Sequence, residues 1–303
     1  MKSIFQKIVN SASDVILDKK EETLLALTCI LSEGHLLIED VPGVGKTTLV
    51  QAIAKLLDFK FSRIQFTNDL LPSDIIGNSI YDPEKKEFRF FEGPLFSHLV
   101  LADELNRANP RTQSALLQAM EEFEVSQDKQ TYSLPKPFIL IATQNPKQQV
   151  GTFNLPESQL DRFLMAIDLN YANKDSELKI FQGADARLAI KKLVTLVTKN
   201  EIVEHQDNAR KVFISPLIAE YIYELLNFTR KNQSYPPLST RSGLSLSKAA
   251  KSYAYIQDRD FAMPEDVQKV FPSVMGHRLG LGEGVKVGKK MADGILQSTK
   301  VPV

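Results

Sequence analysis

The amino-acid sequence predicts an α/β protein in which a parallel five-stranded sheet lies between helices and is followed by an all-α domain. Up to Tyr171, apolar segments of strand length alternate with helical patterns, an alternation typical of a parallel sheet with helices on both faces. From about Asp175 to Gly280 the pattern is helical, with no convincing strand. We therefore divide the chain into a first domain, residues 1–170, and a second domain, residues 171–303.

The five expected strands are short and apolar. They are His35–Asp40, Phe59–Phe66, Leu99–Glu104, Phe138–Asn145 and Met165–Leu169. In the second domain, Thr198 with Glu201 has the pattern of a capping box, and Ser215-Pro216 is typical of a helix start with proline in its first turn.

Two segments outside these strands have the pattern of β-hairpins. The chain between Phe66 and Leu99 is longer than one crossover helix requires, and within it Asn78–Tyr81 and Phe88–Phe91 flank a turn-forming run. A second hairpin is expected over Glu124–Leu134. Both would be insertions into the sheet domain.

Composition excludes several classes of protein. The 303 residues are 43% hydrophobic and carry 37 basic and 37 acidic side chains, so no global positive field favours nucleic acid or a membrane surface. The single cysteine, Cys29, rules out an internal disulfide. The four histidines lie at no metal-ligand spacing. We find neither a signal-peptide core nor a membrane span, and expect a cytoplasmic protein.

The stretch LLIEDVPGVGKTTL, from Leu36 to Leu49, has the pattern of a phosphate-binding loop between a strand and a helix. Asp40 replaces the first glycine of that motif. Because this position only starts the turn, a short residue that tolerates unusual dihedrals can stand there. The residues expected to bind the phosphates are Pro42, Gly43, Val44, Gly45, Lys46, Thr47 and Thr48, through their backbone amides and the lysine.

Two acids end the strand LVLADE, at the edge where parallel sheets place their ligands. In a P-loop enzyme Asp103 would hold Mg²⁺ together with the hydroxyl of Thr47, and Glu104 would orient and deprotonate the attacking water. The alternative is that either acid caps the helix near Pro110 or pairs with Arg107.

Three further polar residues are candidates for the same chemistry. Asn145 ends the strand FILIATQN and could hold the γ-phosphate or the water; it could equally start a turn before Pro146. Arg162 and Arg241 are the candidates to neutralise charge on the leaving phosphate. Either arginine could instead be an ordinary surface residue, with Arg162 paired to a nearby acid, Glu157 or Asp161.

The motifs PGVGKTT, LADELNRA, ATQNP, LPESQLDRF and STRSG, in this order, resemble those of an AAA+ ATPase. The segments IQFTNDLLPSDIIG, EFRFFEGPLF and LNRANPRTQSALLQAMEE resemble signatures of the MoxR family in particular. The resemblance covers the chain from about Ser11 to its end and implies an AAA+ three-layer αβα domain with a smaller all-helical lid.

The resemblance also implies roles for individual residues. Lys46 and Thr47 match Walker A, Asp103 and Glu104 match Walker B, and Asn145 matches sensor 1. Further matches are Arg162 to the arginine finger, which reaches the next subunit's nucleotide, and Arg241 to sensor 2, acting within its own subunit or across to a neighbour. The segment that meets the adenine contains Val15 and Ile16 here, in place of the usual V-x-G-Q.

The activity implied by the resemblance is Mg²⁺-dependent ATP hydrolysis in a homo-oligomer, a hexameric ring, that remodels or activates a client protein. Such clients are often metalloenzymes or proteins with a von Willebrand A domain. One rival is a nucleic-acid motor, with Lys85, Lys86 and Arg89 on one hairpin or Lys129 on the other gripping phosphates. The other is a nucleotide-dependent scaffold with little turnover, against which an intact Glu104 argues.

Overall fold

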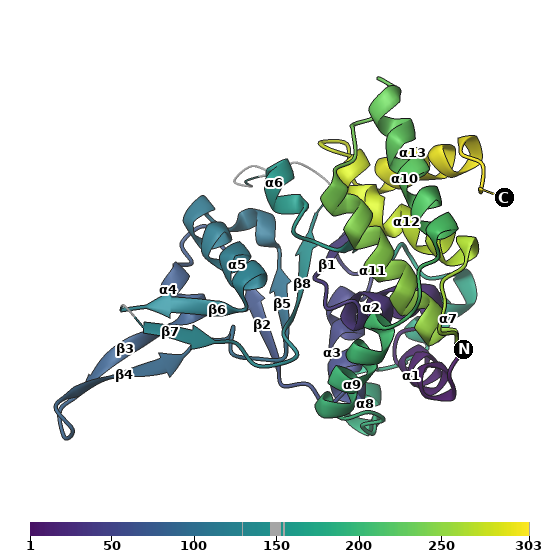
Figure 1. Cartoon of the computed structure of the whole chain (residues 1–303). Coiled ribbons are helices and arrows are strands. Elements are labelled where there is room, and N and C mark those ends of the chain that lie inside the picture. Colours follow the sequence, from purple (N-terminus) through teal and green to yellow (C-terminus); the bar gives the residue numbers. More distant parts are fainter. Residues whose placement is uncertain (129, 146–152, 154, 303) are drawn as a thin grey trace.

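The computed structural model describes residues 1–128, 130–145, 153 and 155–302. Its centre is a parallel sheet of five strands in the order β2-β5-β8-β1-β9, with helices on both faces and a large group of helices beyond one end (Figure 1). The sheet strands are β1 (Leu36–Glu39), β2 (Phe61–Gln65), β5 (Leu99–Asp103), β8 (Ile139–Gln144) and β9 (Met165–Ile167). All five expected strands are confirmed, and each is shorter than its apolar run by up to two residues at one or both ends.

The helices of the first part of the chain cover the two sheet faces. They are α1 (Ser3–Ser13), α2 (Lys20–Leu31), α3 (Lys46–Leu56), α4 (Pro72–Ile76), the 3-10 turn η1 (Leu105–Arg107), α5 (Pro110–Glu122) and α6 (Glu157–Leu160). Successive side chains of a strand point to opposite faces of the sheet, so the buried apolar residues form two hydrophobic cores, one on each face. Leu36 and Ile38 pack with α1, α2 and α3, whereas Leu37 packs with α5 on the opposite face.

Both expected hairpins are present. β3 (Gly77–Asp82) pairs antiparallel with β4 (Glu87–Glu92), and β6 (Glu124–Gln127) pairs with β7 (Gln130–Ser133). They project from the side of the sheet that faces away from the helical group (Figure 1). Phe90 of β4 stacks on Tyr132 of β7, with ring centroids 4.1 Å apart, so the bases of the two hairpins support one another.

Beyond β9 the described chain is helical apart from one isolated bridge. The helices are α7 (Lys174–Phe181), α8 (Ala186–Lys192), α9 (Lys199–Arg210), α10 (Pro216–Lys231), α11 (Thr240–Ile256), α12 (Pro264–Leu279) and α13 (Val285–Ser298). The expected capping box is confirmed, since Thr198 and Glu201 bond reciprocally at the start of α9, and Ser215 caps α10. Among the helices of the described residues, none is long and apolar enough to cross a membrane.

His35, at the start of β1, is a structural histidine. Its Nε2 donates to the carbonyl of Met120 on α5 (3.0 Å), and its Nδ1 accepts the amide of Leu140 on β8 (3.0 Å). These two bonds join the sheet to the helix that covers it. Burial lowers the pKa of His35 to about 4, so the ring is neutral at physiological pH.

We expect His35 to make the fold acid-sensitive. Between about pH 6.5 and about pH 4 the unfolded chain binds a proton that folded His35 does not. Stability from this group is therefore complete above pH 6.5 and falls as the pH drops, by up to ~1.4 kcal/mol per unit, on the order of 3 kcal/mol in all. Urea unfolding of wild type and His35→Gln measures this: the variant loses less stability across the window, and equal losses would contradict the assignment.

Candidate functional site

The phosphate-binding loop lies between β1 and α3, as expected. Gly43 (φ 87°) and Gly45 (φ 92°) both adopt left-handed backbone, a conformation that costs other residues energy. The loop is exposed to half-buried, and the Nζ of Lys46 donates to the carbonyl of Asp40 at 2.7 Å. The loop therefore offers open amides at a helix N-terminus, beside a lysine, which is an arrangement suited to phosphate.

Asp40 has a structural role that our sequence interpretation missed. Its buried carboxylate accepts the amide of Val41 (2.7 Å) and, across the sheet edge, those of Leu169 (2.7 Å) and Asn170 (2.6 Å). We attributed the aspartate to a tolerance of unusual dihedrals, but its backbone does not adopt the left-handed conformation. The residue instead ties the start of the loop to the segment that follows β9, because a buried carboxylate needs such donors.

Lys46 lies in the field of three carboxylates. Burial lowers its pKa, while the charges of Asp103, Asp40 and Glu104 act in the opposite direction. The structure thus brings the loop lysine and both strand-end acids into one site. An ammonium group held among these carboxylates is positioned for a bound anion.

Asp103 ends β5, and both of its carboxylate oxygens are engaged. Oδ2 accepts from Arg63 of β2, at 2.6 Å from Nη2 and 3.2 Å from Nε. Oδ1 accepts the hydroxyl of Thr143 of β8 at 2.6 Å. The acid therefore lies between the two neighbouring strands and makes polar contacts to both.

Glu104 directly follows β5 in a left-handed backbone conformation (φ 57°), which is uncommon for glutamate. Its Oε2 accepts from Gln65 (3.0 Å) and pairs with Arg107 (3.1 Å), and its amide donates to Thr143 (2.9 Å). The alternative pairing with Arg107 is therefore real. Neither acid caps α5, which is capped by Asn109.

Asn145 directly follows β8, the strand between β5 and β1. Because the strands are parallel, it lies at the same sheet edge as Asp103 and the loop. Pro146 and Lys129, which were also named as candidates, lie outside the described residues.

Glu39, the last residue of β1, is buried at the same sheet edge as Asn145. It accepts from Gln144 (2.6 Å) and from the amide of Val285 at the start of α13 (2.6 Å).

The segment expected at the adenine lies against the loop. Val15 and Ile16 are buried between α1 and α2, and a Cβ added to Gly45 would come 3.1 Å from the Cδ1 of Ile16. Asp18 nearby accepts the amide of Asn173 at 2.9 Å. The structure thus places this apolar segment beside the phosphate loop.

The site fits Mg²⁺ only when phosphate is also bound. Thr47 and Asp103 supply hard oxygen donors, which this ion prefers. Among the described residues, no group of three His, Cys, Asp or Glu side chains could hold a metal alone. The ion would complete its coordination with phosphate oxygens and water, its usual arrangement in nucleotide-binding proteins.

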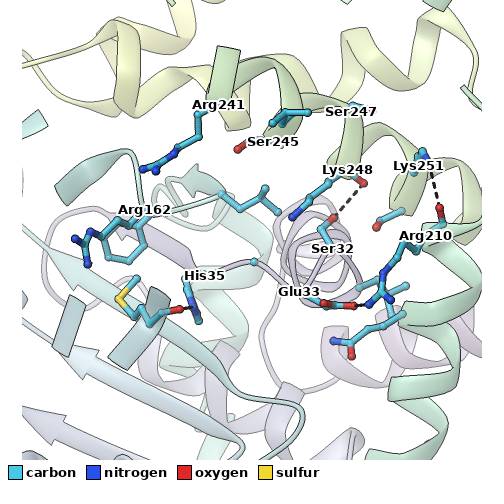
Figure 2. A pocket seen from close by; sticks show the side chains of 18 of the residues that line it. Ser32, Glu33, His35, Arg162, Arg210, Arg241, Ser245, Ser247, Lys248 and Lys251 are labelled. Atoms are coloured by element: carbon cyan, nitrogen blue, oxygen red, sulfur yellow. Dashed lines mark hydrogen bonds and ion pairs between the residues drawn. The ribbon is translucent and has the colours of Figure 1, made fainter. Parts of the chain in front are cut away.

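Arg162 and Arg241 meet in a different place, a cleft of about 670 Å³ between α2, α5, α9 and α11. Glu121 of α5 pairs with both, at 3.1 Å from Arg162 and 3.8 Å from Arg241. The acidic partner of Arg162 is therefore Glu121 and not Glu157 or Asp161. Arg162 also donates to the carbonyl of Leu117 (2.5 Å). Figure 2 shows the two arginines reaching from different elements toward the same side of the cleft.

The cleft lies at the sheet edge where the strands begin. Its lining includes Gly34 and His35, directly before β1, and Phe163 and Leu164, directly before β9. The phosphate loop follows the opposite end of β1, whose four residues span about 13 Å at ~3.3 Å per residue. The two arginines and Lys46 therefore lie on opposite edges of the same sheet.

Sequence reasoning missed four residues that hold the candidate groups in place. These are Arg63, Gln65, Thr143 and Glu121. Each acts through a partner that is distant in the chain, such as Arg63 and Asp103, 40 residues apart. The one available signal is the spacing of two residues in FSRIQ, which places Arg63 and Gln65 on one face of β2.

The fold and the loop define a P-loop ATPase of the AAA+ class. The family described as ATPases associated with various cellular activities (AAA) matches residues 35–165, and the AAA lid domain matches residues 237–297. A candidate ATPase from Cytophaga hutchinsonii has a similar solved structure, with a TM-score of 0.87, 36% identity, and coverage of 99% of this chain and 95% of that one.

Proteins of similar sequence identify the family within the AAA+ class. Chaperone MoxR1 of Mycobacterium tuberculosis is 38% identical over 84% of this chain and 70% of its own length. Protein MoxR of Methylorubrum extorquens is 29% identical over 85% and 82%, and the uncharacterized protein YeaC of Bacillus subtilis is 41% identical over 98% and 94%. This chain belongs to the MoxR family of AAA+ ATPases.

Proposed function

We propose that this protein is a ring-forming ATPase that hydrolyses ATP to ADP and phosphate with Mg²⁺ and uses the turnover to remodel a client protein. The observation that carries the proposal is the separation of two complementary half-sites. One sheet edge holds Lys46, Asp103 and Glu104, and the opposite edge holds Arg162 and Arg241. The arginines at the first edge, Arg63 and Arg107, are paired with Asp103 and Glu104, so we assign the arginines that phosphoryl transfer requires to the second half.

The two halves complement one another between copies. A head-to-tail contact that places one copy's cleft on the next copy's phosphate loop would bring Arg162 and Arg241 to the γ-phosphate. Repeated contacts of this kind form a ring when the rotation between copies closes. Arg241 then acts in trans, because it contacts Glu121 and Asp161 at the same edge as Arg162. We propose a hexamer, which is the ring that the family resemblance implies.

Within one copy, each side chain has a separate task. Lys46 binds phosphate, and Thr47 with Asp103 would hold Mg²⁺, which supplies charge neutralisation at the phosphate oxygens. Glu104 takes the proton of the attacking water, and Asn145 orients that water or the γ-phosphate. Val15 and Ile16 supply the apolar contact for the adenine.

We propose that residues 171–303 form a lid that moves relative to residues 1–170 during turnover. One contact links the lid region to the start of the loop, and a second links the loop to the last residue before the lid. Glu39, which precedes the loop, accepts the amide of Val285 at the start of α13, and Asp40 accepts that of Asn170. A change of loop position on hydrolysis would therefore act on the lid through both contacts.

The client surface is proposed on the β3–β4 hairpin. Tyr81 and Phe88 form an edge-on ring pair, 5.4 Å between centroids, and Phe88 is 74% exposed. Exposed aromatic groups suit a polypeptide partner. At the tip, Glu84 and Glu87 flank the basic pair Lys85 and Lys86, and these acids are unfavourable for binding nucleic-acid phosphates. A metalloenzyme or a von Willebrand A domain protein is the client class that the resemblance implies.

Replacing Lys46 tests the nucleotide site. Lys46→Ala removes a charge-assisted contact to phosphate, so ATP affinity is expected to fall about 10- to 100-fold. Lys55→Ala is the matched control, because Lys55 is an exposed lysine in the last turn of the same helix. Isothermal titration with ATP and Mg²⁺ makes the comparison. Equal affinity in wild type and Lys46→Ala would reject the proposed site.

A further inference from the structure

Arg278, near the end of α12, is a buried arginine whose contacts reach far along the chain. It lies in the segment that matches the AAA lid domain and is 6% exposed. A guanidinium has five N–H donors in a fixed fork, and here all five have acceptors. Four donate to the turn between α6 and β9, at Asp161, Phe163 and Leu164, and the fifth donates to the carbonyl of Val274 in α12 itself.

The residues bound by this fork lie on both sides of Arg162. The Nε of Arg278 donates to the Oδ1 of Asp161 at 2.7 Å, and its Nη2 donates to the carbonyls of Phe163 (3.0 Å) and Asp161 (3.3 Å). The buried neighbour His277 donates from its Nε2 to the same Phe163 carbonyl at 3.1 Å. Two adjacent side chains of α12 therefore fix the backbone that carries Arg162.

The fork is also linked to the second arginine of the cleft. Asp161 binds Arg278 through Oδ1 and faces Arg241 through Oδ2 at 3.8 Å. Glu121 then joins Arg241 to Arg162. The side chain of Arg278 is 5% exposed, whereas that of Arg241 is 59% exposed. The buried arginine is thus the fixed end of a network whose exposed end can reach a neighbouring molecule, which is how a functional side chain is held by a supporting layer.

We propose that Arg278 is a positioning residue for Arg162 and Arg241, the arginines that one copy presents to the nucleotide of the next. The inference rests on the proposed shared site and adds to it a residue of the matched lid segment. The turn that Arg278 holds comes directly before β9, at the sheet edge opposite the phosphate loop. Its effect therefore falls on the neighbour's nucleotide and not on that of its own chain.

The first measurement separates turnover from binding. Arg278→Met keeps most of the length of the side chain and removes the fork. Because a misplacement of about 1 Å at a reacting centre can cost on the order of a hundredfold in rate, turnover of the assembled protein is expected to fall about 10- to 100-fold. ATP affinity of the unassembled chain should stay at the wild-type value. Phosphate release and isothermal titration measure the two quantities.

A mixing experiment then shows on which side of the contact the defect lies. Arg278→Met retains a normal Glu104, and Glu104→Gln retains a normal Arg278. Equal amounts assembled together should recover roughly a quarter of the wild-type rate if copies join at random. Arg278→Met mixed with Arg162→Ala should not exceed the rate of Arg278→Met alone, because neither copy then presents a correctly placed Arg162. A variant that is only misfolded would recover with neither partner.

Arg259→Met is the matched control. Arg259 binds Asp266 in the first turn of α12, with Nη1 2.6 Å from Oδ2, and the side chain of Asp266 is 1% exposed. The variant removes a buried partner at the other end of the same helix and leaves the turn before β9 untouched, so assembled turnover should stay within a few-fold of wild type. Thermal unfolding of both variants is compared. If Arg278→Met does not fold, Arg278→Lys takes its place in the same mixtures, because lysine keeps the charge beside Asp161 without the fork.

Four results would overturn the proposal. They are normal turnover in assembled Arg278→Met, recovery with Arg162→Ala, recovery with neither partner, and an equal loss of turnover in Arg259→Met. Failure of the shared site itself looks different: Arg162→Ala and Glu104→Gln would then not complement one another, whatever the residue at position 278.

Discussion

Glu104→Gln is expected to lower the rate of ATP hydrolysis by about 10²- to 10⁴-fold, the contribution typical of a positioned general base. The amide keeps the shape of the side chain and its place beside Gln65 and Arg107 but cannot accept the proton of the attacking water. Binding of ATP and Mg²⁺ should persist, since Lys46, Thr47 and Asp103 are unchanged. A steady-state phosphate-release assay, together with nucleotide titration, measures both quantities.

The control for this variant is Glu220→Gln, an exposed glutamate on α10 far along the chain from the site. It removes the same charge and should hydrolyse ATP at the wild-type rate. Turnover within a few-fold of wild type in Glu104→Gln would remove this residue from the chemistry and favour a nucleotide-dependent scaffold instead.

Arg162→Ala is expected to lower turnover on the order of a thousandfold or more, the scale seen when an arginine that reaches a neighbour's γ-phosphate is lost. Within its own chain the residue lies at the sheet edge opposite the phosphate loop, so the loss appears only in assembled protein. ATP binding by the unassembled chain should not change. Hydrolysis measured across a range of protein concentrations, with assembly followed by light scattering, separates the two effects.

Arg210→Ala is the matched control, because Arg210 lines the same cleft but pairs with Glu33 at its other end. Figure 2 shows this pair on the far side of the cleft from Arg162. If Arg162→Ala retained normal turnover in assembled rings, the proposed trans contact would be wrong. If both variants lost activity equally, the cleft would act through its overall charge and not through a single guanidinium.

The sheet and the phosphate loop could be predicted because their signals are local. Apolar runs such as Leu36–Glu39 are bounded by turn residues, and Gly43 and Gly45 mark the positions where the loop needs left-handed backbone. The hairpin at Gly77–Glu92 was likewise indicated by its own turn. The strand ends were less exact, because an apolar run continues past the last residue that pairs with a neighbour.

The residues that hold the site together could not be predicted, because sheet order is not local. Nothing near Arg63 in the sequence indicates that β2 lies next to β5 and places the guanidinium on Asp103. Thr143 reaches the same acid from the other neighbouring strand. The buried role of Asp40 depends in the same way on Leu169 and the end of β9, 129 residues away.

The position of Arg162 and Arg241 in the fold also bears on whether they can act within their own subunit or on a neighbour. The sequence left two alternatives for Arg241, within its own subunit or across to a neighbour. Its contacts to Glu121 and Asp161 place it beside Arg162 at the start of the strands, and this placement supports the second alternative. A helix-rich second domain alone would not have distinguished them, since the direction in which α11 presents its first turn is set by packing.

Mixing two inactive variants tests the shared site most directly. Glu104→Gln supplies a normal Arg162, and Arg162→Ala supplies a normal Glu104, so their mixed contacts contain one complete site. Equal amounts, assembled together, should recover roughly a quarter of the wild-type rate if copies join at random in head-to-tail contacts. Activity that stays at the level of the separate variants, with mixed assemblies verified by mass spectrometry, would contradict a site built from two copies.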